Sequence, residues 1–456
     1  MVLSTTRSIG CGSRRKTFIA RARSQFVGGG FEVASSFRTV GALGVLAVFV
    51  MLSAAPVASQ AQTRTLADWT LAIYLDSDNN LDSWAQKDVD EMLSVGSTNA
   101  VNLIVLWDTT AGPAHVYKVL KGELLELRDC KLNEIETNMG DPETLREFAS
   151  YAFDHFPAER HALLAWDHGD DFRGCMFDDH IPYDGFDLLT HQEVVAALAG
   201  FKIDVLVYAA CVLSMVEVAY EYYASGLDID YLVANEGYDP MPGFPYDTIL
   251  VKLTAQPSMS SLALAKTFVD DYIDYYAITG KRRAMSLDQQ YRQVTLSVIQ
   301  LSKMGDVVSD IKGMTSAIIP EMGACAGIVS DARGHANLPW CENGWERDVD
   351  LPTLVKVIHD QSLDARYTRG IDPATVTSVV SASENAMISL SDAILHCRSL
   401  YPMEKTGCLG MGVYFPSSRG SYEHCGLIYG DCYGQMLFAN EIWLDFLNAY
   451  WEVQKG

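Results

Sequence analysis

The chain has 456 residues, and its 34 Lys and Arg against 58 Asp and Glu give a formal net charge of −24. Such an excess of negative charge excludes general affinity for nucleic acid, because the phosphate backbone would be repelled. The length exceeds what one ordinary hydrophobic core supports, which predicts a large domain with a further C-terminal part. The sequence contains no internal repeat and no low-complexity linker, so we expect the second part to pack onto the first.

Residues 1–61 have the profile of a targeting segment. They hold seven Lys and Arg but one acidic residue, and an apolar stretch from Val40 to Leu52 precedes small residues from Ser53 to Ala61. This profile predicts a signal peptide cleaved after Ala58 or Ala61. An uncleaved membrane anchor is the alternative, because the apolar span barely reaches the roughly 18 to 20 residues of a membrane helix. Either way the preceding positive charge predicts a secreted or extracytoplasmic protein, in the periplasm or at the cell surface, with no other membrane contact.

Residues 62–280 are predicted to form an α/β domain. Five apolar runs alternate with helical patterns, and they are Leu71–Tyr74, Val101–Trp107, Ala162–Trp166, Val205–Tyr208 and Tyr231–Ala234. Short continuous apolar runs suit strands that are buried on both faces of a parallel sheet. The helical pattern from Thr190 to Leu198 joins the third and fourth runs into a βαβ unit. The sequence therefore predicts a mostly parallel central sheet covered by helices.

Two neighbouring runs each end at a chemically reactive residue. The run ending at Trp166 continues into Asp167-His168-Gly169, and the run ending at Tyr208 continues into Ala209-Ala210-Cys211. Open α/β sheets place their working residues just beyond the carboxyl ends of strands. His168 and Cys211 are therefore predicted to be an acid/base group and its nucleophile. Each residue alone also fits an ordinary explanation, a buried small cysteine or a turn, so the prediction depends on their joint placement.

A helical pattern follows Cys211 at once, and its start would favour the thiolate through the helix dipole and free backbone N–H groups. The same N–H groups can stabilise a developing oxyanion. Gly169, which has no side chain, would allow its own N–H to approach the reacting carbonyl as a second donor. Cys211, His168 and Gly169 are thus the predicted catalytic residues.

Seven motifs, in order, carry a resemblance to a known family. They are Trp69 to Leu81, Asn138 to Leu145, Trp166 to Gly169, Cys211 with Met215 to Ala219, Pro240 to Tyr246, Gly412 to Pro416 and Trp443 to Leu447. With them the chain resembles the clostripain family of cysteine peptidases, in the caspase-like clan, from about Trp69 to Tyr450. The resemblance implies a three-layer caspase-like sandwich for the catalytic domain, residues 62–280. It also implies a Cys-His dyad that cleaves protein or peptide substrates, usually after Arg or Lys.

One position departs from the family pattern. The family usually has an aspartate two residues before the nucleophile to bind a basic P1 side chain, and this chain has Ala209 there. Alanine cannot form the bidentate pair with arginine that a carboxylate forms. Asp239 matches a second acidic position of the family and is the expected replacement, although a solvated loop carboxylate is the alternative. The loop from Pro240 to Tyr246 is expected to wall the substrate pocket.

Two further readings of the same residues stay open. An inactive homologue would bind peptides or partner proteins in the same cleft, although the presence of both dyad residues and Gly169 argues for activity. An active peptidase could also accept uncharged P1 residues, because Ala209 would open a neutral pocket. The interval between the dyad residues holds Arg173 and Lys202 as its basic residues, so we expect either cleavage after Arg173 or, in preference, a single-chain enzyme.

Residues 281–456 are predicted to be a cysteine-rich α/β extension, with a strand at Val294–Ile299 and helices from Leu301 and near Leu351. Loss of the leader removes Cys11 and leaves nine cysteines. An odd number in an exported protein indicates one free thiol, expected at Cys211. The others are expected to form up to four disulfides, and they are Cys130, Cys175, Cys325, Cys341, Cys397, Cys408, Cys425 and Cys432.

No cofactor is expected, and no metal site is assigned. The spacing from Asp76 to Asp82 imitates an EF-hand loop, but Leu81 and Lys87 stand where glycine and glutamate are required. A structural calcium ion is the one alternative, at an acidic cluster near His168 whose ordinary explanation is a solvated loop. That cluster consists of Asp170, Asp171, Asp178 and Asp179. The tryptophans Trp84, Trp107 and Trp166 are interpreted as core residues.

Overall fold

The computed structural model describes residues 66–182, 185–283, 294–338, 348–400, 408–423 and 433–454. These residues belong to one compact unit. The predicted targeting segment, residues 1–61, lies outside the described residues. Within the described ranges, no helix is both long enough and apolar enough to cross a membrane.

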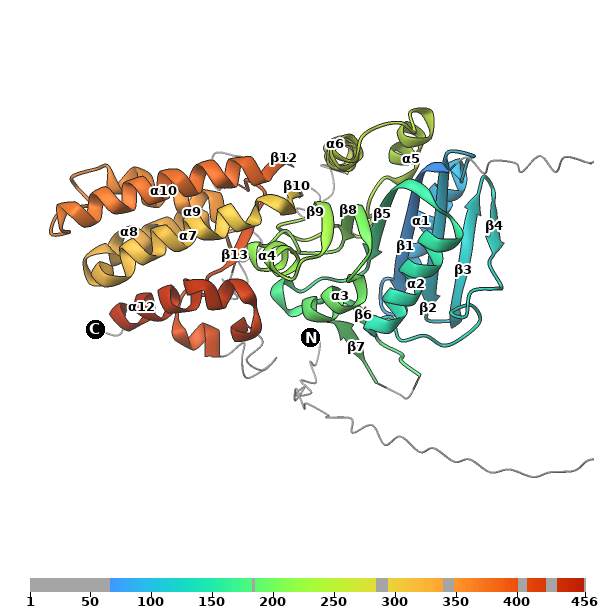
Figure 1. The fold of residues 1–456 in the computed structure, drawn as a ribbon, viewed down its shortest axis with the longest axis horizontal. Coiled ribbons are helices and arrows are strands. Elements are labelled where there is room, and N and C mark those ends of the chain that lie inside the picture. The colour runs from blue at the N-terminus through green and yellow to red at the C-terminus, as the bar shows by residue number, and fades with distance from the viewer. Residues whose placement is uncertain are drawn as a thin grey trace, which may run out of the picture. The chain divides into compact units, whose positions relative to one another are not determined.

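A nine-stranded sheet forms the centre, in the order β12-β10-β9-β8-β5-β1-β2-β3-β4 (Figure 1). Its five inner strands are parallel: β1 Ala67–Ser77, β2 Val101–Thr109, β5 Ala158–Trp166, β8 Lys202–Ala209 and β9 Asp228–Ala234. Its antiparallel edges are β3 Gly112–Leu120, β4 Glu123–Glu126, β10 Thr295–Gln300 and β12 Ile394–Ser399. Each of the five predicted runs lies inside a parallel strand, because side chains on both faces of these strands are buried.

Helices cover both faces of this sheet. One face carries α1 Asp82–Val95, α5 Tyr246–Ala255 and α6 Ser261–Arg283, and the other carries α2 Pro142–His155, α3 His191–Leu198 and α4 Val216–Ala224. Two separate apolar cores result, one on each face. Helix α3 begins where the sequence predicted, because Thr190 and Glu193 form a capping box. The prediction of a three-layer α/β sandwich with a mostly parallel sheet is confirmed.

The chain beyond residue 280 extends the sheet through β10 and β12 and adds a group of helices beside it (Figure 1). The helices are α7 Met304–Ile318, α8 Met322–Ala336, α9 Leu351–Ser362, α10 Pro373–Ala393 and α12 Leu444–Gln454. Two short strands, β11 Asp348–Asp350 and β13 Gly412–Tyr414, pair with each other. The predicted strand at Val294–Ile299 corresponds to β10, and the helix predicted from Leu301 corresponds to a short 3-10 turn followed by α7.

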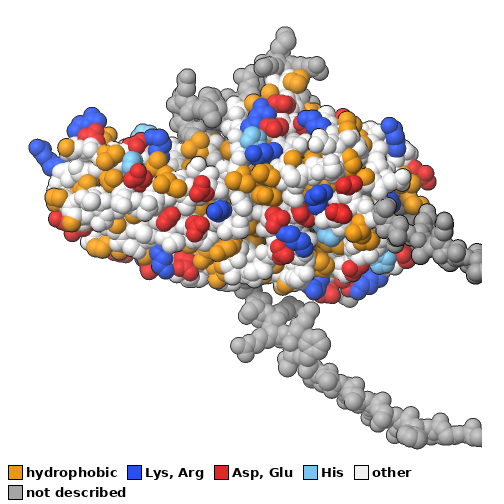
Figure 2. Space-filling model, turned by 45° about the horizontal axis from the view of Figure 1, so that its top comes forward, with side chains coloured by type: hydrophobic (Ala, Val, Ile, Leu, Met, Phe, Trp, Pro, Cys, Tyr) orange, Lys and Arg blue, Asp and Glu red, His pale blue; other side chains and the backbone are white. Residues whose placement is uncertain are grey.

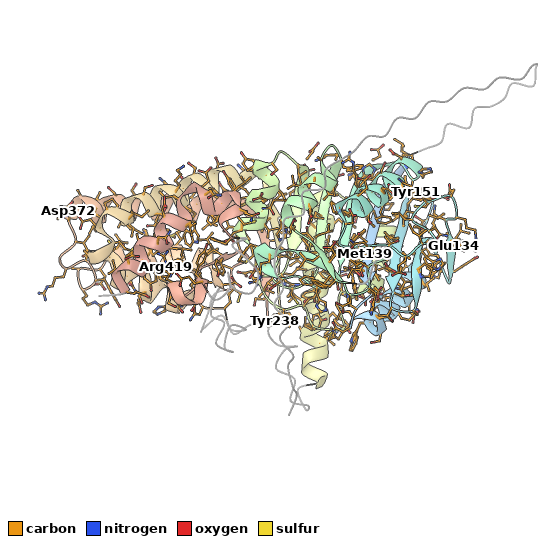
Figure 3. All side chains as sticks on the ribbon, turned by 90° about the horizontal axis from the view of Figure 1, so that it is seen from below. Glu134, Met139, Tyr151, Tyr238, Asp372 and Arg419 are labelled. Carbon is orange, nitrogen blue, oxygen red and sulfur yellow. The ribbon has the colours of Figure 1, made fainter. Side chains whose placement is uncertain are left out.

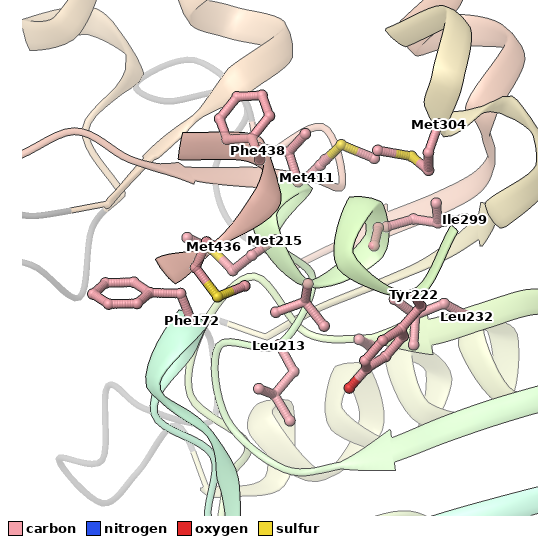
Figure 4. Close-up of a cluster of buried hydrophobic side chains, with 14 of the residues drawn as sticks. Phe172, Leu213, Met215, Tyr222, Leu232, Ile299, Met304, Met411, Met436 and Phe438 are labelled. Carbon is pink, nitrogen blue, oxygen red and sulfur yellow. The ribbon is translucent and has the colours of Figure 1, made fainter. Parts of the chain in front are cut away.

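Side chains from both parts of the chain share one apolar core. Figure 4 shows Leu213 and Met215, which follow β8, packed with Met304, Met411 and Met436 from the C-terminal part. All of these side chains are buried. The C-terminal part therefore supports the loop that follows β8, where the predicted nucleophile lies.

Polar contacts hold the same two parts together. The buried carboxylate of Glu236, just after β9, accepts from the Gly410 N–H at 2.8 Å. The carbonyl oxygen of Gly410 accepts from the hydroxyls of Ser214 and Ser297, both at 2.7 Å. Asp350 accepts from the Leu409 N–H at 2.7 Å. These hydrogen bonds fix the segment at Gly410 against the loops after β8 and β9. Burial raises the pKa of Glu236 well above its ordinary value and that of Asp350 to about 6.

The face of the molecule in Figure 2 carries basic side chains scattered among acidic and hydrophobic ones. Many described basic groups are paired, as in the contacts of Lys202 with Asp228 at 3.0 Å and of Arg398 with Asp274 at 2.8 Å. On that face, therefore, the structure presents no extended basic patch.

The prediction of up to four disulfides is wrong for the cysteines that the structure describes. Five of the eight are free thiols, namely Cys130, Cys175, Cys325, Cys397 and Cys408. Cys130 lies in the loop after β4, Cys175 in strand β6 Cys175–Asp178 and Cys325 in α8. The Cys397 thiol donates to the carbonyl oxygen of Cys408 at 3.7 Å instead of bonding to its sulfur. The remaining three, Cys341, Cys425 and Cys432, lie outside the described residues. An odd cysteine count therefore says little about which thiols are paired.

We expect the four buried thiols among these five, at Cys130, Cys175, Cys325 and Cys408, to react with iodoacetamide only after the protein is unfolded. Burial raises the pKa of Cys130, Cys175 and Cys325 above the ordinary value, and burial also excludes the reagent. Mass spectrometry after alkylation in denaturant, with and without prior reduction, measures this directly. All five should be alkylated equally in both samples. A disulfide-linked peptide that contains any two of them would contradict the structure.

Candidate active site

The two predicted catalytic residues lie at the ends of neighbouring strands. Strands β5 and β8 are parallel, and Trp166 pairs with Ala209 at their carboxyl ends. Two residues further on, His168 and Cys211 both line an open cavity of about 90 Å³. Its lining residues are Leu81, Trp84, Trp166, Asp167, His168, Ala209, Cys211, Asp239, Pro240, Met241 and Gly243. The structure thus brings together His168, Cys211, Ala209 and Asp239, as the sequence predicted.

Gly169 allows the two loops to approach each other. A Cβ atom at this position would lie 2.3 Å from the carbonyl oxygen of Cys211 and 3.0 Å from the Leu213 side chain. No side chain fits there without moving the backbone after β8. The His168 loop is held on its other side, where the Met176 N–H of the hairpin β6 Cys175–Asp178 and β7 Asp187–Leu189 donates to the His168 carbonyl at 3.1 Å.

Cys211 does not lie at a helix N-terminus, which corrects the prediction from the sequence. Helix α4 begins at Val216, and the intervening turn contains Val212 at φ +49, a conformation that β-branched residues rarely adopt. The Asp239 N–H donates to the Cys211 sulfur at 3.2 Å. Burial nevertheless dominates and raises the pKa of the Cys211 thiol to about 12. This environment therefore favours the neutral thiol over the thiolate that the sequence suggested.

The turn after Cys211 is fixed by the loop that follows β9. The Val212 N–H donates to the Gly237 carbonyl, and the Ser214 N–H donates to the Asn235 carbonyl, both at 2.8 Å. These bonds join the turn after Cys211 to the loop that carries Asp239, because Gly237 lies two residues before Asp239.

His168 has a side-chain partner that the sequence did not reveal. Its Nε2 lies 2.9 Å from Oδ1 of Asn80, in the loop between β1 and α1. The Phe177 ring meets the imidazole edge to face, at 6.1 Å between centroids. Burial lowers the pKa of His168 below its ordinary value, more than the charge of Asp179 raises it. The sequence did contain one hint of this contact. Asn80 belongs to the segment from Asp76 to Asp82, which resembled an EF-hand loop but lacked two of the residues that such a loop requires.

Asp239 is not a solvated loop carboxylate. It lines the cavity, its Oδ1 accepts from the Tyr272 hydroxyl at 2.7 Å, and burial raises its pKa to about 7. A second carboxyl group, Asp88 of α1, lies 1% exposed behind the cavity wall. It accepts from Trp166 Nε1 at 2.7 Å, and a Cβ atom at Gly243 would lie 2.7 Å from it. Trp84 and Trp166, interpreted as core, also line the cavity.

Tyr246 is not among the residues that line the cavity. It begins α5, its ring is buried in the core, and its N–H donates to Glu91 at 3.0 Å. The exposed aromatic residue of this region is instead Tyr238, one residue before Asp239, with 57% of its surface accessible (Figure 3).

Three of the four carboxylates in the acidic cluster considered for calcium contact other protein groups. Asp170 and Asp171 both pair with the Arg173 guanidinium, and Asp178 accepts from the Met139 and His180 N–H groups at 2.8 and 3.0 Å. In the parts of the chain that the structure describes, no group of three or more His, Cys, Asp or Glu side chains could hold a metal ion. Asp170, Asp171 and Asp178 thus already have protein partners in this structure.

Comparisons with known proteins identify the family of this chain. The clostripain family, peptidase C11, matches residues 73–394. Clostripain from Hathewaya histolytica is 28% identical over 221 residues, which span 41% of this chain and 42% of clostripain. The aligned region thus covers less than half the length of that relative.

Two solved structures share the fold. A secreted C11 cysteine protease from Bacteroides thetaiotaomicron, in complex with an irreversible peptide inhibitor, has a TM-score of 0.57 at 17% identity, over 82% of this chain and 99% of that one. An inactive zymogen C11 protease from Parabacteroides distasonis has a TM-score of 0.54 at 16% identity, over 83% of this chain and 99% of that one. Because the family match spans well over half of the sequence, the chain belongs to the clostripain family.

Proposed function

We propose that the protein is a cysteine endopeptidase in which Cys211 is the nucleophile and His168 its acid/base partner. The observation that carries this proposal is that both side chains line one cavity at the carboxyl ends of two adjacent parallel strands. Membership of the clostripain family supports the reaction class. Protein or peptide substrates follow from that class.

The electrostatics favour a neutral resting pair, so proton transfer accompanies attack. As the Cys211 sulfur bonds to the scissile carbonyl carbon, the imidazole of His168 takes the thiol proton. The N–H groups of Cys211 and Gly169 stabilise the oxyanion. The imidazolium then gives its proton to the leaving amine as the C–N bond breaks. In the second half, His168 removes a proton from water, the thioester is hydrolysed, and the proton returns to sulfur.

For specificity, we propose a preference for Arg or Lys at P1 that depends on Asp239. Its carboxyl group lines the cavity next to Ala209, and a desolvated carboxylate distinguishes a cation from a neutral group. With a neutral Ala209, the selectivity should be weaker than in a pocket with two lining aspartates. The competing proposal is a preference for uncharged P1 residues, because Ala209 would leave that part of the pocket neutral.

An irreversible label tests activity against the alternative of an inactive peptide-binding homologue. A peptidyl chloromethyl ketone with Arg at P1 should add covalently to Cys211, and a matched ketone with norleucine at P1 should react more slowly. Mass spectrometry of the digested protein locates the adduct, with Cys211→Ala as the control. A protein that binds the peptide reversibly yet forms no adduct at Cys211 would be the inactive homologue.

We also propose that the active enzyme is a single chain. Cleavage after Arg173 would require access to a side chain that is 5% exposed. Its guanidinium pairs with Asp170 at 2.8 Å and Asp171 at 2.6 Å. We therefore expect no new N-terminus at Gly174 when the purified active enzyme is incubated and sequenced. A new N-terminus anywhere between Gly174 and Cys211 in the active form would contradict this expectation.

Export is a further proposal. It draws on the basic and apolar profile of residues 1–61 and on the relative described as secreted. Disulfides would have supported export, because they form in oxidising compartments. The described cysteines are free thiols and give no such support.

A further inference from the structure

The loop between β1 and α1 belongs to no part of the mechanism so far, although it touches the acid/base residue. Its Asn80 lies 88 positions before His168, and the two side chains meet at 2.9 Å between Oδ1 and Nε2. Among the described residues, no other side chain donates to or accepts from this imidazole. We propose that Asn80 is a positioning residue that selects the catalytic tautomer and orientation of His168, an inference that builds on the proposed peptidase function.

The chemistry of the contact decides which imidazole nitrogen can act as a base. An amide oxygen is only an acceptor, so the Nε2 that faces it must carry hydrogen. The neutral ring then has its lone pair on Nδ1, which is the nitrogen left to take the Cys211 proton. When the ring becomes an imidazolium, the same oxygen continues to accept from Nε2 and stabilises the charge. One contact therefore fixes both the tautomer and the ring orientation through the cycle.

The loop that carries Asn80 is anchored to the residue before His168. The side-chain amide of the preceding residue, Asn79, donates to Asp167 at 2.7 Å and to the Phe177 carbonyl at 2.8 Å. Its oxygen accepts from the Leu81 N–H at 2.8 Å. Asn79 is buried, whereas Asn80 is exposed. The two asparagines thus have separate roles: Asn79 fixes the loop against the strand end, and Asn80 extends from that fixed loop to the imidazole.

Substitution of Asn80 separates this role from a merely structural one. Asn80→Ala should lower kcat roughly 10- to 100-fold with little change in KM, because misorientation of a catalytic group costs that order of rate. Asn80→Asp keeps the acceptor oxygen and should restore most of kcat. Its negative charge should also move the acidic limb of the kcat/KM profile to higher pH, because a carboxylate favours the imidazolium. The melting temperature of both variants should match the wild type.

A matched control is Asn99→Ala. Asn99 is exposed between α1 and β2. It lies at the amino ends of the parallel strands, whereas the site lies at their carboxyl ends. It should leave kcat and the pH profile unchanged. A kcat for Asn80→Ala within twofold of the wild type would overturn the proposal. So would an equal loss of kcat in Asn80→Ala and Asn80→Asp.

Histidine 15N NMR tests the same contact without turnover. The wild-type protein should show His168 as the Nε2–H tautomer, and Asn80→Ala should show a mixture of tautomers. An unchanged tautomer in Asn80→Ala would overturn the proposal even in a protein that lacks peptidase activity. Failure of the proposed function is recognised separately, as a wild-type enzyme that neither hydrolyses peptides nor forms the adduct at Cys211.

Discussion

Cys211→Ala is expected to abolish peptide hydrolysis, with a fall in kcat of roughly 10⁴-fold or more, because covalent turnover requires the sulfur. His168→Ala should cost a similar factor, since the imidazole is the proposed acceptor of the thiol proton. The raised pKa of Cys211 strengthens this expectation. A neutral thiol depends on a base, whereas a preformed thiolate would retain part of its reactivity.

The measurement is steady-state hydrolysis of a fluorogenic peptide with Arg at P1, and far-UV circular dichroism and thermal unfolding establish that the variants fold. Cys211 lies in a turn and not in a core element, so the melting temperature should change little. Cys325→Ser is the matched control, because its thiol is buried in α8, remote in sequence from the site. It should keep full kcat. A Cys211→Ala protein that hydrolyses peptide at a rate comparable to the wild type would refute the assignment.

Asp239→Ala should lower kcat/KM for Arg substrates by roughly 100-fold while changing it little for norleucine substrates. The reason is that removing one partner of a desolvated charge pair typically costs 2 to 5 kcal/mol or more. Ala209→Asp should act in the opposite direction and raise kcat/KM for Arg substrates. The contact between the Asp239 N–H and the sulfur is made by the backbone, so both variants keep it.

Two conservative variants sharpen this test. Asp239→Asn keeps a partner for the Tyr272 hydroxyl and removes only the charge. Asp88→Asn keeps an acceptor for Trp166 but removes a carboxyl group that lies behind the cavity wall, so its effect on Arg substrates should be smaller. A P1 profile dominated by uncharged residues, and unaffected by Asp239→Ala, would favour the neutral pocket and leave the dyad assignment intact.

The role of Asp239 also predicts how kcat/KM for Arg substrates changes with pH. Burial raises the pKa of Asp239 to about 7 in the free enzyme, so the group is neutral below that pH and charged above it. Because only the carboxylate pairs with a cation, kcat/KM for Arg substrates should rise as pH increases through about 7. Norleucine substrates and the Asp239→Asn variant should lack this limb. The limb from His168 should lie below the ordinary range, because burial lowers the His168 pKa.

The inner part of the fold could be predicted from the sequence. Strands β1, β2, β5, β8 and β9 are apolar on both faces because helices cover both, so each appears as a continuous apolar run. The outer strands β3, β4 and β12 gave no such run, although β10 did. Strand β3 alternates buried and partly exposed residues, and β12 is partly exposed along its whole length. Their place in the sheet depends on pairing with distant strands, which no local pattern encodes.

The joint placement of His168 and Cys211 could be predicted from local features, because each residue follows its own strand by two positions and parallel neighbours place those ends together. The sequence by itself therefore determined the inner strands of the sheet and the neighbouring positions of His168 and Cys211. Tertiary structure alone decided which side chains surround them. Burial turned the expected thiolate into a neutral thiol, and packing left five cysteines unpaired. The loop before α1 brought Asn80 to His168 across 88 residues, and contacts over such separations follow from packing, which local sequence patterns do not specify.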